Sequence, residues 1–448
     1  MKKRIVLWIL VLLLIVALCP VSAFADNGPY TLRTEIEGKD PQLIRAYDAL
    51  YAGNIYLSLT DLAAALNGTE KQFRFERIVS STDGEYFAVT RAQAAALSSG
   101  ASEERPYSGT DVLNPYRNRL FVDGNEHKYY THNNGNGDLY MSLTDVQLML
   151  DLTAELPDSG RLVLQLDRPF LPDISQLKED GYFEMMNSVY LGDAATGKSL
   201  FYYDSRETMP VASISKLLSY VVLREALDSG EIRETDTVRI SENVQRLSFS
   251  ADGIIRMLAG QAIPFRELLE GMLISSSNEC ALALAEHLCG SEEAFVQRMN
   301  TKAQELGLRS AEMFNCHGLP SYSEGNVPVK HQNRMSASDL FKLTCLILER
   351  YPDITEITSR QYLKMPSLDN YQSANSNPLL FNMEGVTGMK TGSTNRAGYC
   401  LVATMPVQAE DGEHVIVLVI LGAESADVRG QAAEILLRYA ADRLSQTD

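Results

Sequence analysis

The sequence predicts an α+β protein in which a small repeat module precedes a larger domain built around one antiparallel sheet. First, 448 residues exceed the size of one average domain. Second, residues 27–166 contain the same strand-and-helix pattern twice. Third, strand patterns at both ends of residues 172–445 enclose a run of helical patterns. Strands from the two ends must therefore meet in one layered sheet, which is not the doubly wound parallel arrangement.

The first 25 residues have the pattern of a secretory signal peptide. Basic residues at 2–4 precede an apolar run at 5–18, and residues 23–25 (Ala-Phe-Ala) have the small-x-small form of a cleavage site. The apolar run is short for a membrane span, and an uncleaved anchor is the alternative. Cys19 lacks the small neighbours that lipid attachment needs. We therefore expect a secreted, extracytoplasmic protein at the cell wall or the membrane surface.

Charge and cysteine content exclude several classes of protein. The chain has 40 Lys+Arg and 58 Asp+Glu, a net charge of −18, and removal of the three basic signal residues leaves 37 against 58, or −21. Such a charge opposes binding to nucleic acid. The five cysteines beyond Cys19 are an odd number without a short-spaced framework, which favours buried thiols over a disulfide scaffold.

The repeat in the N-terminal module is Tyr-Leu-Ser-Leu-Thr-Asp at 56–61 and Tyr-Met-Ser-Leu-Thr-Asp at 140–145, each before an apolar helical run. The pattern predicts a short strand and then a helix capped by Asp or Thr, in two pseudo-symmetric copies. Residues 27–166 thereby resemble the copper amine oxidase-like N-terminal domain of exported bacterial proteins. We nevertheless expect no metal and no cofactor, because no ligand cluster accompanies His127 and His132.

The larger domain, residues 172–445, follows a proline-containing linker at 167–173. Strand patterns occur at 188–192, 200–204, 388–391, 398–405 and 414–421. Helical periodicity is found at 213–227, 265–274, 278–288, 292–306, 336–350 and about 426–444.

Ser213 and Lys216 stand three residues apart at the start of the first of these helices, a spacing that puts both side chains on one face. A serine hydroxyl needs a base to become a nucleophile, and a lysine is such a base only when its amine is neutral. Burial and a second cation, such as Lys390, would favour the neutral amine. The motif alone is weak evidence, because Ser175 and Lys178 repeat the spacing in a polar turn.

Two further motifs accompany this pair. Residues 276–278 (Ser-Ser-Asn) interrupt two apolar helices, so their polar side chains must face a polar site or cap the second helix. Residues 390–392 (Lys-Thr-Gly) lie on a glycine-bordered strand, where a ligand backbone can approach closely. A surface hairpin with a solvated lysine is the alternative for the last motif taken alone.

With these motifs, residues from about 180 to 440 resemble the D-alanyl-D-alanine carboxypeptidases, the low-molecular-weight penicillin-binding serine peptidases of the S11 family. Segments 209–213, 314–320, 336–340 and 388–403 also match the family. The resemblance implies the fold of the serine β-lactamase/transpeptidase group. It also implies a substrate, the peptidoglycan stem peptide ending in D-Ala-D-Ala, and covalent inhibition by β-lactams.

The resemblance implies catalytic roles for five residues. Ser213 would be the acylated nucleophile and Lys216 its general base. Ser276 and Lys390 would pass a proton to the leaving D-alanine. Asn278 would hold either the substrate's peptide carbonyl or the Lys216 amine.

The resemblance also implies how the substrate is bound. The backbone N–H groups of Ser213 and Ser393 would form the oxyanion hole beside Gly392. Thr391 and Arg429 would hold the terminal carboxylate, since a guanidinium fits a carboxylate fork. A solvated helix arginine is the alternative for Arg429.

Three other functions are compatible with the same fold. A β-lactamase needs a carboxylate that activates the deacylating water, and the segment from Glu312 to Asn315 resembles such a motif. An endopeptidase acting on D-amino cross-links has the same sequence pattern. A non-catalytic wall-binding protein would have no reason to keep the five catalytic positions. The N-terminal module is expected to contact the cell wall.

Overall fold

The computed structural model describes residues 30–48, 55–82, 84–95, 118–129, 131–133, 137–158, 160–168, 170, 174, 183–322, 330–410 and 412–445. The predicted signal peptide, the Ser175–Lys178 pair and most of the predicted linker lie outside the described residues. The chain divides into two compact units, Met1–Asn118 with Thr131–Arg168 and Arg119–Tyr130 with Pro169–Asp448. Each unit is described by itself.

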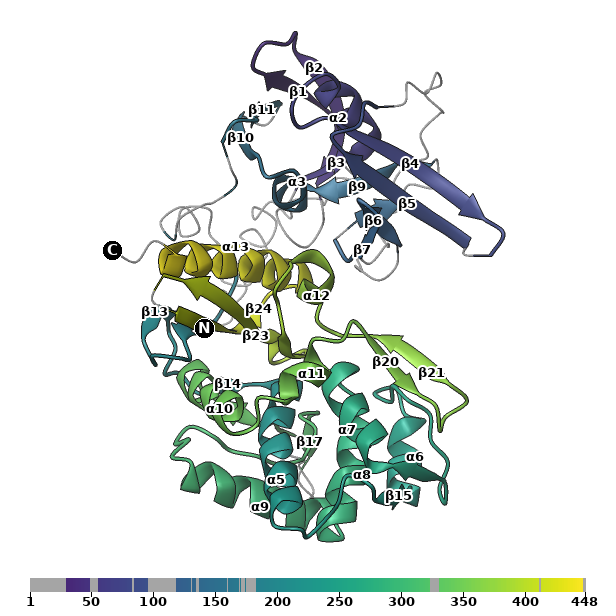
Figure 1. Ribbon diagram of the computed structural model, residues 1–448, viewed down its shortest axis with the longest axis vertical. Coiled ribbons are helices and arrows are strands. Elements are labelled where there is room, and N and C mark those ends of the chain that lie inside the picture. Colours follow the sequence, from purple (N-terminus) through teal and green to yellow (C-terminus); the bar gives the residue numbers. More distant parts are fainter. Residues whose placement is uncertain are drawn as a thin grey trace, which may run out of the picture. The chain divides into compact units, whose positions relative to one another are not determined.

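The first unit contains a seven-stranded sheet with the order β10-β11-β1-β2-β3-β9-β8 (Figure 1). Its strands are β1 (Tyr30–Ile36), β2 (Gln42–Asp48), β3 (Ile55–Ser58), β8 (Thr131–Asn133), β9 (Leu139–Ser142), β10 (Thr153–Asp158) and β11 (Arg161–Gln165). The unit also holds helices α2 (Leu59–Leu66) and α3 (Leu143–Leu150) and a hairpin of β4 (Phe73–Ser80) and β5 (Gly84–Arg91).

The two sequence repeats form equivalent strand-and-helix units that pair with each other, β3 lying antiparallel to β9. The prediction that Asp or Thr caps the helices was wrong. Ser58 caps α2 and Ser142 caps α3, and each hydroxyl accepts the N–H of the aspartate three residues later. The reason is that each strand ends earlier than expected, at the serine, so the leucine after the serine already has helical geometry.

A buried carboxylate connects the two repeats. Asp138 precedes β9 and accepts hydrogen bonds from the hydroxyls of Ser58 (2.6 Å) and Thr60 (2.8 Å) and from the guanidinium of Arg45 (3.0 Å). Burial raises the pKa of Asp138 above its ordinary value, although these donors oppose the shift. The first copy is therefore bonded to the entrance of the second copy.

The second unit is built on a five-stranded antiparallel sheet with the order β13-β12-β24-β23-β22. These strands are β12 (Ser188–Asp193), β13 (Ser199–Tyr203), β22 (Gly388–Thr394), β23 (Gly398–Ala409) and β24 (Gly412–Ala423). The first strand of this sheet along the chain, β12, pairs with the last, β24, as predicted from strands at both ends of the domain. Helices α13 (Ala426–Ser445) and α10 (Ala337–Arg350) pack on opposite faces of this sheet (Figure 1).

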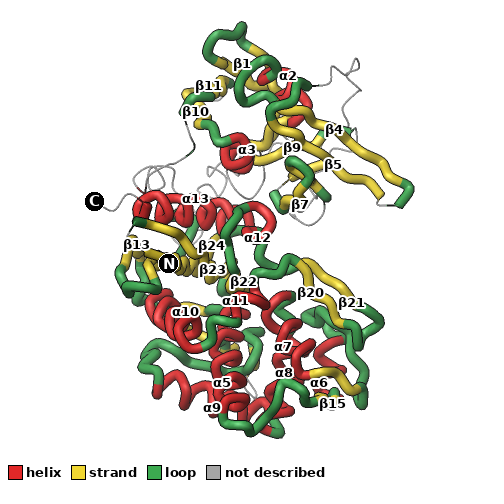
Figure 2. The backbone as a smooth tube through the Cα atoms, in the orientation of Figure 1, coloured by secondary structure: helices red, strands yellow, loops and turns green. Residues whose placement is uncertain are grey.

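A group of helices follows the early strands and forms the other half of the unit (Figure 2). Its elements are η1 (Ala212–Ser215), α5 (Lys216–Asp228), α6 (Glu242–Ser248), α7 (Phe265–Ile274), α8 (Asn278–Cys289), α9 (Glu292–Glu305) and α11 (Ile354–Thr358). The short helix α12 (Leu379–Asn382) lies beside α13 instead, where Asn382 donates to Glu434 (3.2 Å; Figure 1). Short two-stranded antiparallel sheets pair β14 (Met209–Pro210) with β19 (Arg334–Met335), β15 (Thr237–Arg239) with β16 (Ala262–Pro264), β17 (Ser321–Tyr322) with β18 (Lys330–His331) and β20 (Tyr362–Met365) with β21 (Tyr371–Ala374).

The segment Arg119–Tyr130 belongs to this second unit, although the repeat pattern lies on both sides of it. It forms a hairpin of β6 (Leu120–Val122) and β7 (Asn125–His127). Asn382 Oδ1 accepts the N–H of Lys128 (2.7 Å), and the Lys128 ammonium lies 5.0 Å from the ring centroid of Phe381. Within the described residues, no helix is both long and apolar enough to span a bilayer.

Candidate active site

Ser213 lies in a tight turn between a short strand and a buried helix. Val211 donates its N–H to the Asn333 carbonyl (3.0 Å), Ala212 has a left-handed φ of 47°, and the 3₁₀ turn Ala212–Ser215 follows. The periodicity predicted that Ser213 opens an α-helix, but α5 begins only at Lys216. The turn leaves Ser213 half-buried between buried neighbours, and its hydroxyl lies 3.3 Å from the His317 carbonyl oxygen.

The Lys216 amine is buried beneath this turn and contacts the serine. Its side chain is 0% exposed, and its Nζ lies 2.8 Å from Ser213 Oγ, 2.8 Å from Asn278 Oδ1 and 2.7 Å from the His317 carbonyl oxygen. Burial lowers the pKa of Lys216 to about 7, against the opposing effect of negative groups such as Glu279. About half of these amines are therefore neutral at neutral pH and able to accept a proton.

The Ser-Ser-Asn segment forms the break between α7 and α8, as predicted. Ser277 caps α8, because its hydroxyl accepts the N–H of Cys280 (3.0 Å). Ser276 has a left-handed φ of 64° at the break itself. Asn278 is the first residue of α8, and its amide nitrogen donates to the Asp252 carbonyl (3.1 Å). This bond turns the Asn278 oxygen towards Lys216.

The Lys-Thr-Gly strand passes directly beside the nucleophile. A Cβ atom added to Gly392 of β22 would lie 2.8 Å from the backbone nitrogen of Ser213, so only glycine fits there. Lys390 is 1% exposed and donates to the Thr391 carbonyl (2.8 Å). Burial holds the pKa of Lys390 well below its ordinary value, and the charges of Lys216 and Arg429 lower it further. Ser393 is exposed.

Arg429 lies in the first turn of α13 and is buried, at 7% exposure, which excludes the solvated alternative. Its guanidinium is 6.0 Å from the ring centroid of Tyr399. Its Nε is buried and has no hydrogen-bond partner among the described residues. A carboxylate can accept from a guanidinium edge of this kind.

Sequence reasoning gave no role to His317, whose carbonyl is the shortest contact of Lys216. The segment 314–320 was noticed only as a family match, because a backbone carbonyl leaves no signature in residue type. Gly318 is the residue from which the sequence could have indicated this turn. It has a left-handed φ of 96°, and a Cβ there would lie 2.1 Å from the Ala212 carbonyl oxygen.

Glu292, Cys316 and His317 lie close enough for metal ligation, with their ligand atoms within 4.8 Å of one another. These three side chains are joined by hydrogen bonds to one another and to the backbone. His317 Nδ1 accepts the N–H of Leu319 (3.1 Å), so the proton of the neutral ring is on Nε2, which faces Glu292 (3.4 Å). Burial keeps the Cys316 thiol protonated by raising its pKa, and this thiol donates to Glu292 (3.1 Å).

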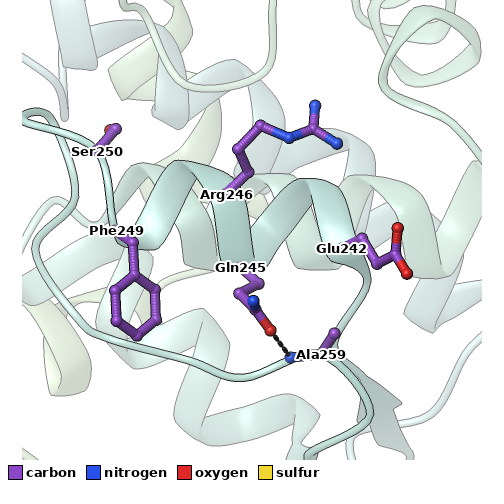
Figure 3. Close-up of a pocket in the computed structure, with 6 residues that line it drawn as sticks. All are labelled: Glu242, Gln245, Arg246, Phe249, Ser250 and Ala259. Carbon is purple, nitrogen blue, oxygen red and sulfur yellow. Dashed lines mark hydrogen bonds between the residues drawn. The ribbon is translucent and has the colours of Figure 1, made fainter.

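Two pockets lie on the helical half of the second unit. One, of about 810 Å³, is lined by Asp252, Asn315 and His317, which adjoin Asn278 and Lys216. The other, of about 710 Å³, lies along α6 and is lined by Glu242, Gln245, Arg246, Phe249, Ser250 and Ala259 (Figure 3). Ser213 lines neither of them. The first pocket is thus the one beside the serine–lysine pair.

The fold and the site define a class of protein, the serine acyl-transfer domains of the penicillin-binding proteins. The family model described as "D-alanyl-D-alanine carboxypeptidase" (Peptidase_S11) matches residues 185–425, which is more than half of the chain. The chain therefore belongs to this family, as the motifs predicted.

Among curated relatives, D-alanyl-D-alanine carboxypeptidase DacF of Bacillus subtilis is 33% identical over 255 residues, 56% of this chain and 61% of the relative. DacD of Escherichia coli is 30% identical over 253 residues, again 56% and 61%. The chain thus spans about three fifths of the length of these relatives.

Among solved structures, penicillin-binding protein 3 of Streptococcus pneumoniae superposes with a TM-score of 0.52 and 29% identity, covering 58% of this chain and 72% of that one. Penicillin-binding protein 6B of E. coli gives 0.50 and 29%, covering 57% and 76%. The predicted α+β fold class is confirmed.

Proposed function

We propose that this protein is an exported serine-type D-alanyl-D-alanine carboxypeptidase, which removes the terminal D-alanine from peptidoglycan stem peptides. One observation carries the proposal. A fully buried lysine amine, with its pKa lowered by burial to about 7, lies 2.8 Å from the hydroxyl of a half-buried serine. Such a pair activates a serine for acyl transfer.

In the proposed reaction, Lys216 takes the proton of Ser213 while the Ser213 oxygen attacks the carbonyl of the penultimate D-alanine. The backbone N–H groups of Ser213 and Ser393 stabilise the oxyanion. Ser276 and Lys390 deliver a proton to the amine of the last D-alanine as the C–N bond breaks. Water then hydrolyses the acyl-serine ester and restores the free hydroxyl.

Substrate binding is assigned to the strand edge and to the last helix. Thr391 and Arg429 hold the terminal carboxylate, supported by the unpartnered buried Nε of Arg429. Gly392 leaves room for the peptide backbone beside the nucleophile. Asn278 positions Lys216 through its side-chain oxygen, supported by their 2.8 Å contact.

Release of D-alanine from a peptide ending in D-Ala-D-Ala tests the proposal. The purified protein should release D-alanine and be labelled by a fluorescent penicillin. Ser213→Ala should abolish both while it leaves thermal unfolding nearly unchanged, because the Lys216 amine keeps Asn278 Oδ1 and the His317 carbonyl as partners. Labelling without D-alanine release from any stem peptide would leave a penicillin-binding protein that lacks this activity.

Two alternatives are separated by the same assay. A β-lactamase would turn over penicillin rapidly, but Glu312 is exposed and so is poorly placed to activate a deacylating water. An endopeptidase would cut cross-linked dimers. A D-alanyl-D-alanine endopeptidase of Pseudomonas aeruginosa is 33% identical to this chain over 222 residues. Comparing monomeric and cross-linked muropeptides decides between carboxypeptidase and endopeptidase.

For the rest of the chain we propose residues 1–25 as a signal peptide, residues 27–166 as a copper amine oxidase-like module and residues 172–445 as the enzymatic domain. The module is supported by the paired repeats around Asp138, and its proposed role is contact with the cell wall. Deletion of residues 27–166 should reduce wall association without abolishing penicillin labelling. Unchanged wall association would remove that role.

A further inference from the structure

The neutral Lys216 amine has as many neighbours as it has hydrogen-bonding positions. A neutral amine carries two N–H donors and one lone pair. Two of its three neighbours, Asn278 Oδ1 and the His317 carbonyl oxygen, have no proton to give and can only accept. If both accept an N–H, the lone pair is left for the third neighbour, Ser213 Oγ. The direction of the Lys216 lone pair therefore depends on these two acceptors.

The Asn278 acceptor is fixed by its own amide, which donates to Asp252. The His317 acceptor belongs to a tight turn, and a single buried side chain closes that turn. Asn315, at 3% exposure, accepts the N–H of Gly318 (2.6 Å) and the N–H of His317 (3.3 Å) through Oδ1. Its Nδ2 donates to the Leu319 carbonyl (2.7 Å).

The same turn is pressed against the backbone of the nucleophile. At Gly318 a Cβ would lie 2.1 Å from the Ala212 carbonyl oxygen, so the two backbones are in contact. Asn333 links the two backbones, because its Nδ2 donates to the Asn315 carbonyl (2.9 Å) and its own carbonyl accepts the Val211 N–H (3.0 Å). Loss of the Asn315 side chain would release the His317 carbonyl, while Asn333 would still anchor the ends of the turn.

We propose that Asn315 is a positioning residue for acylation, which holds the His317 carbonyl so that the Lys216 lone pair points at Ser213. Asn315 has no hydrogen bond to the Ser213 hydroxyl or the Lys216 amine, and it acts only through the turn that holds the His317 carbonyl. The inference rests on the proposed function, because it assigns Lys216 as the base. It adds a residue that neither the three motifs nor the family match singles out by role.

Asn300 provides a matched control. It is a partly buried asparagine that also bonds to the backbone of this segment, accepting the Met313 N–H (2.9 Å) and donating to the Met313 carbonyl (2.8 Å). These bonds are of the same kind, but they hold Met313, before the turn, and not the His317 carbonyl. A purely structural role would give Asn315→Ala and Asn300→Ala the same phenotype.

The experiment measures the non-covalent dissociation constant and the acylation rate constant separately by stopped flow with a fluorescent penicillin, together with Tm. We expect Asn315→Ala to lower the acylation rate constant at least about 30-fold with the dissociation constant within twofold, whereas Asn300→Ala stays within threefold in both. Asn315→Asp keeps the accepting oxygen and should recover most of the acylation rate at about pH 9. Asn315→Ser should have a rate between those of Asn315→Ala and the parent, because the shorter serine side chain closes turns more weakly.

Three results would overturn the inference. They are an acylation rate constant for Asn315→Ala within threefold of the parent, equal losses in the Asn300 and Asn315 variants, and an Asn315→Asp protein as slow as Asn315→Ala. If Asn315→Ala does not fold, the Asp and Ser variants decide, since an unchanged rate in Asn315→Ser contradicts the proposal. A parent protein that is not labelled at Ser213 would instead refute the proposed function.

Discussion

The pH dependence of acylation by a β-lactam reports directly on Lys216. Burial lowers the pKa of this amine to about 7, and its Nζ lies 2.8 Å from Ser213 Oγ. Only the neutral amine accepts the serine proton. The neutral fraction is about one tenth at pH 6, about one half at pH 7 and about nine tenths at pH 8. The acylation rate constant should therefore rise about ninefold from pH 6 to pH 8 and then level off.

A lysine with its ordinary pKa would give a different curve. The rate would rise about 100-fold over the same two pH units and would continue to rise beyond about pH 10. Stopped-flow acylation by a fluorescent penicillin from about pH 5.5 to pH 10 separates the two curves, with Ser213→Ala protein as the control for alkaline hydrolysis of the reagent. A rate that still climbs above pH 9, or one that is flat between pH 6 and pH 8, refutes Lys216 as the base.

Three further predictions concern other parts of the chain. Gly392→Ala puts a Cβ 2.8 Å from the Ser213 backbone nitrogen. We therefore expect penicillin labelling to slow at least about 100-fold while the far-UV circular dichroism spectrum stays native. Labelling at the normal rate would contradict the close approach of β22 to the nucleophile. Arg429→Ala should raise KM about 10-fold or more for peptides that end in a free carboxylate, and it should leave KM unchanged for an ester substrate whose C-terminus is amidated. Equal effects on the two substrates would contradict a role of Arg429 in binding the carboxylate. Asp138→Ala removes the acceptor of the Ser58 hydroxyl, the Thr60 hydroxyl and the Thr60 N–H, whereas Arg45 keeps its ion pair with Asp61, and it should destabilise the N-terminal unit by about 2–4 kcal/mol in hydrogen exchange, with penicillin labelling unchanged; a loss of labelling would show that the site depends on that unit.

The secondary structure of the second unit was largely predictable because its helices have clear periodicity and cap residues. The pattern at 265–274 and 278–288 gave α7 and α8 almost to the residue, and Ser277 caps the second as the cap preference suggests. The short helices α6, α11 and α12 were missed, since 4–7 residues give too few turns for a periodic signal. The start of α5 was misplaced because a 3₁₀ turn has nearly the same spacing as an α-helix.

Residue types in the sequence predicted much of the side-chain part of the site, but they did not predict the backbone carbonyl that belongs to it. Ser213, Lys216, Asn278 and Lys390 were chosen from motif residues, and the first three meet within 2.8 Å contacts. Burial lowers the pKa of Lys216, as expected, but the expected effect of Lys390 runs the other way: the Lys216 charge lowers the pKa of Lys390. The His317 carbonyl was not predictable, because any residue supplies a carbonyl and only the fold decides where it points.

Peptide mapping by mass spectrometry after exposure to penicillin tests the central claim most directly. The account predicts one covalent adduct per chain, on the peptide that contains Ser213, formed at a rate that Lys216→Ala lowers by a factor of about 10²–10⁴. An adduct on another serine, or Lys216→Ala protein that is acylated at the parent rate, would contradict it.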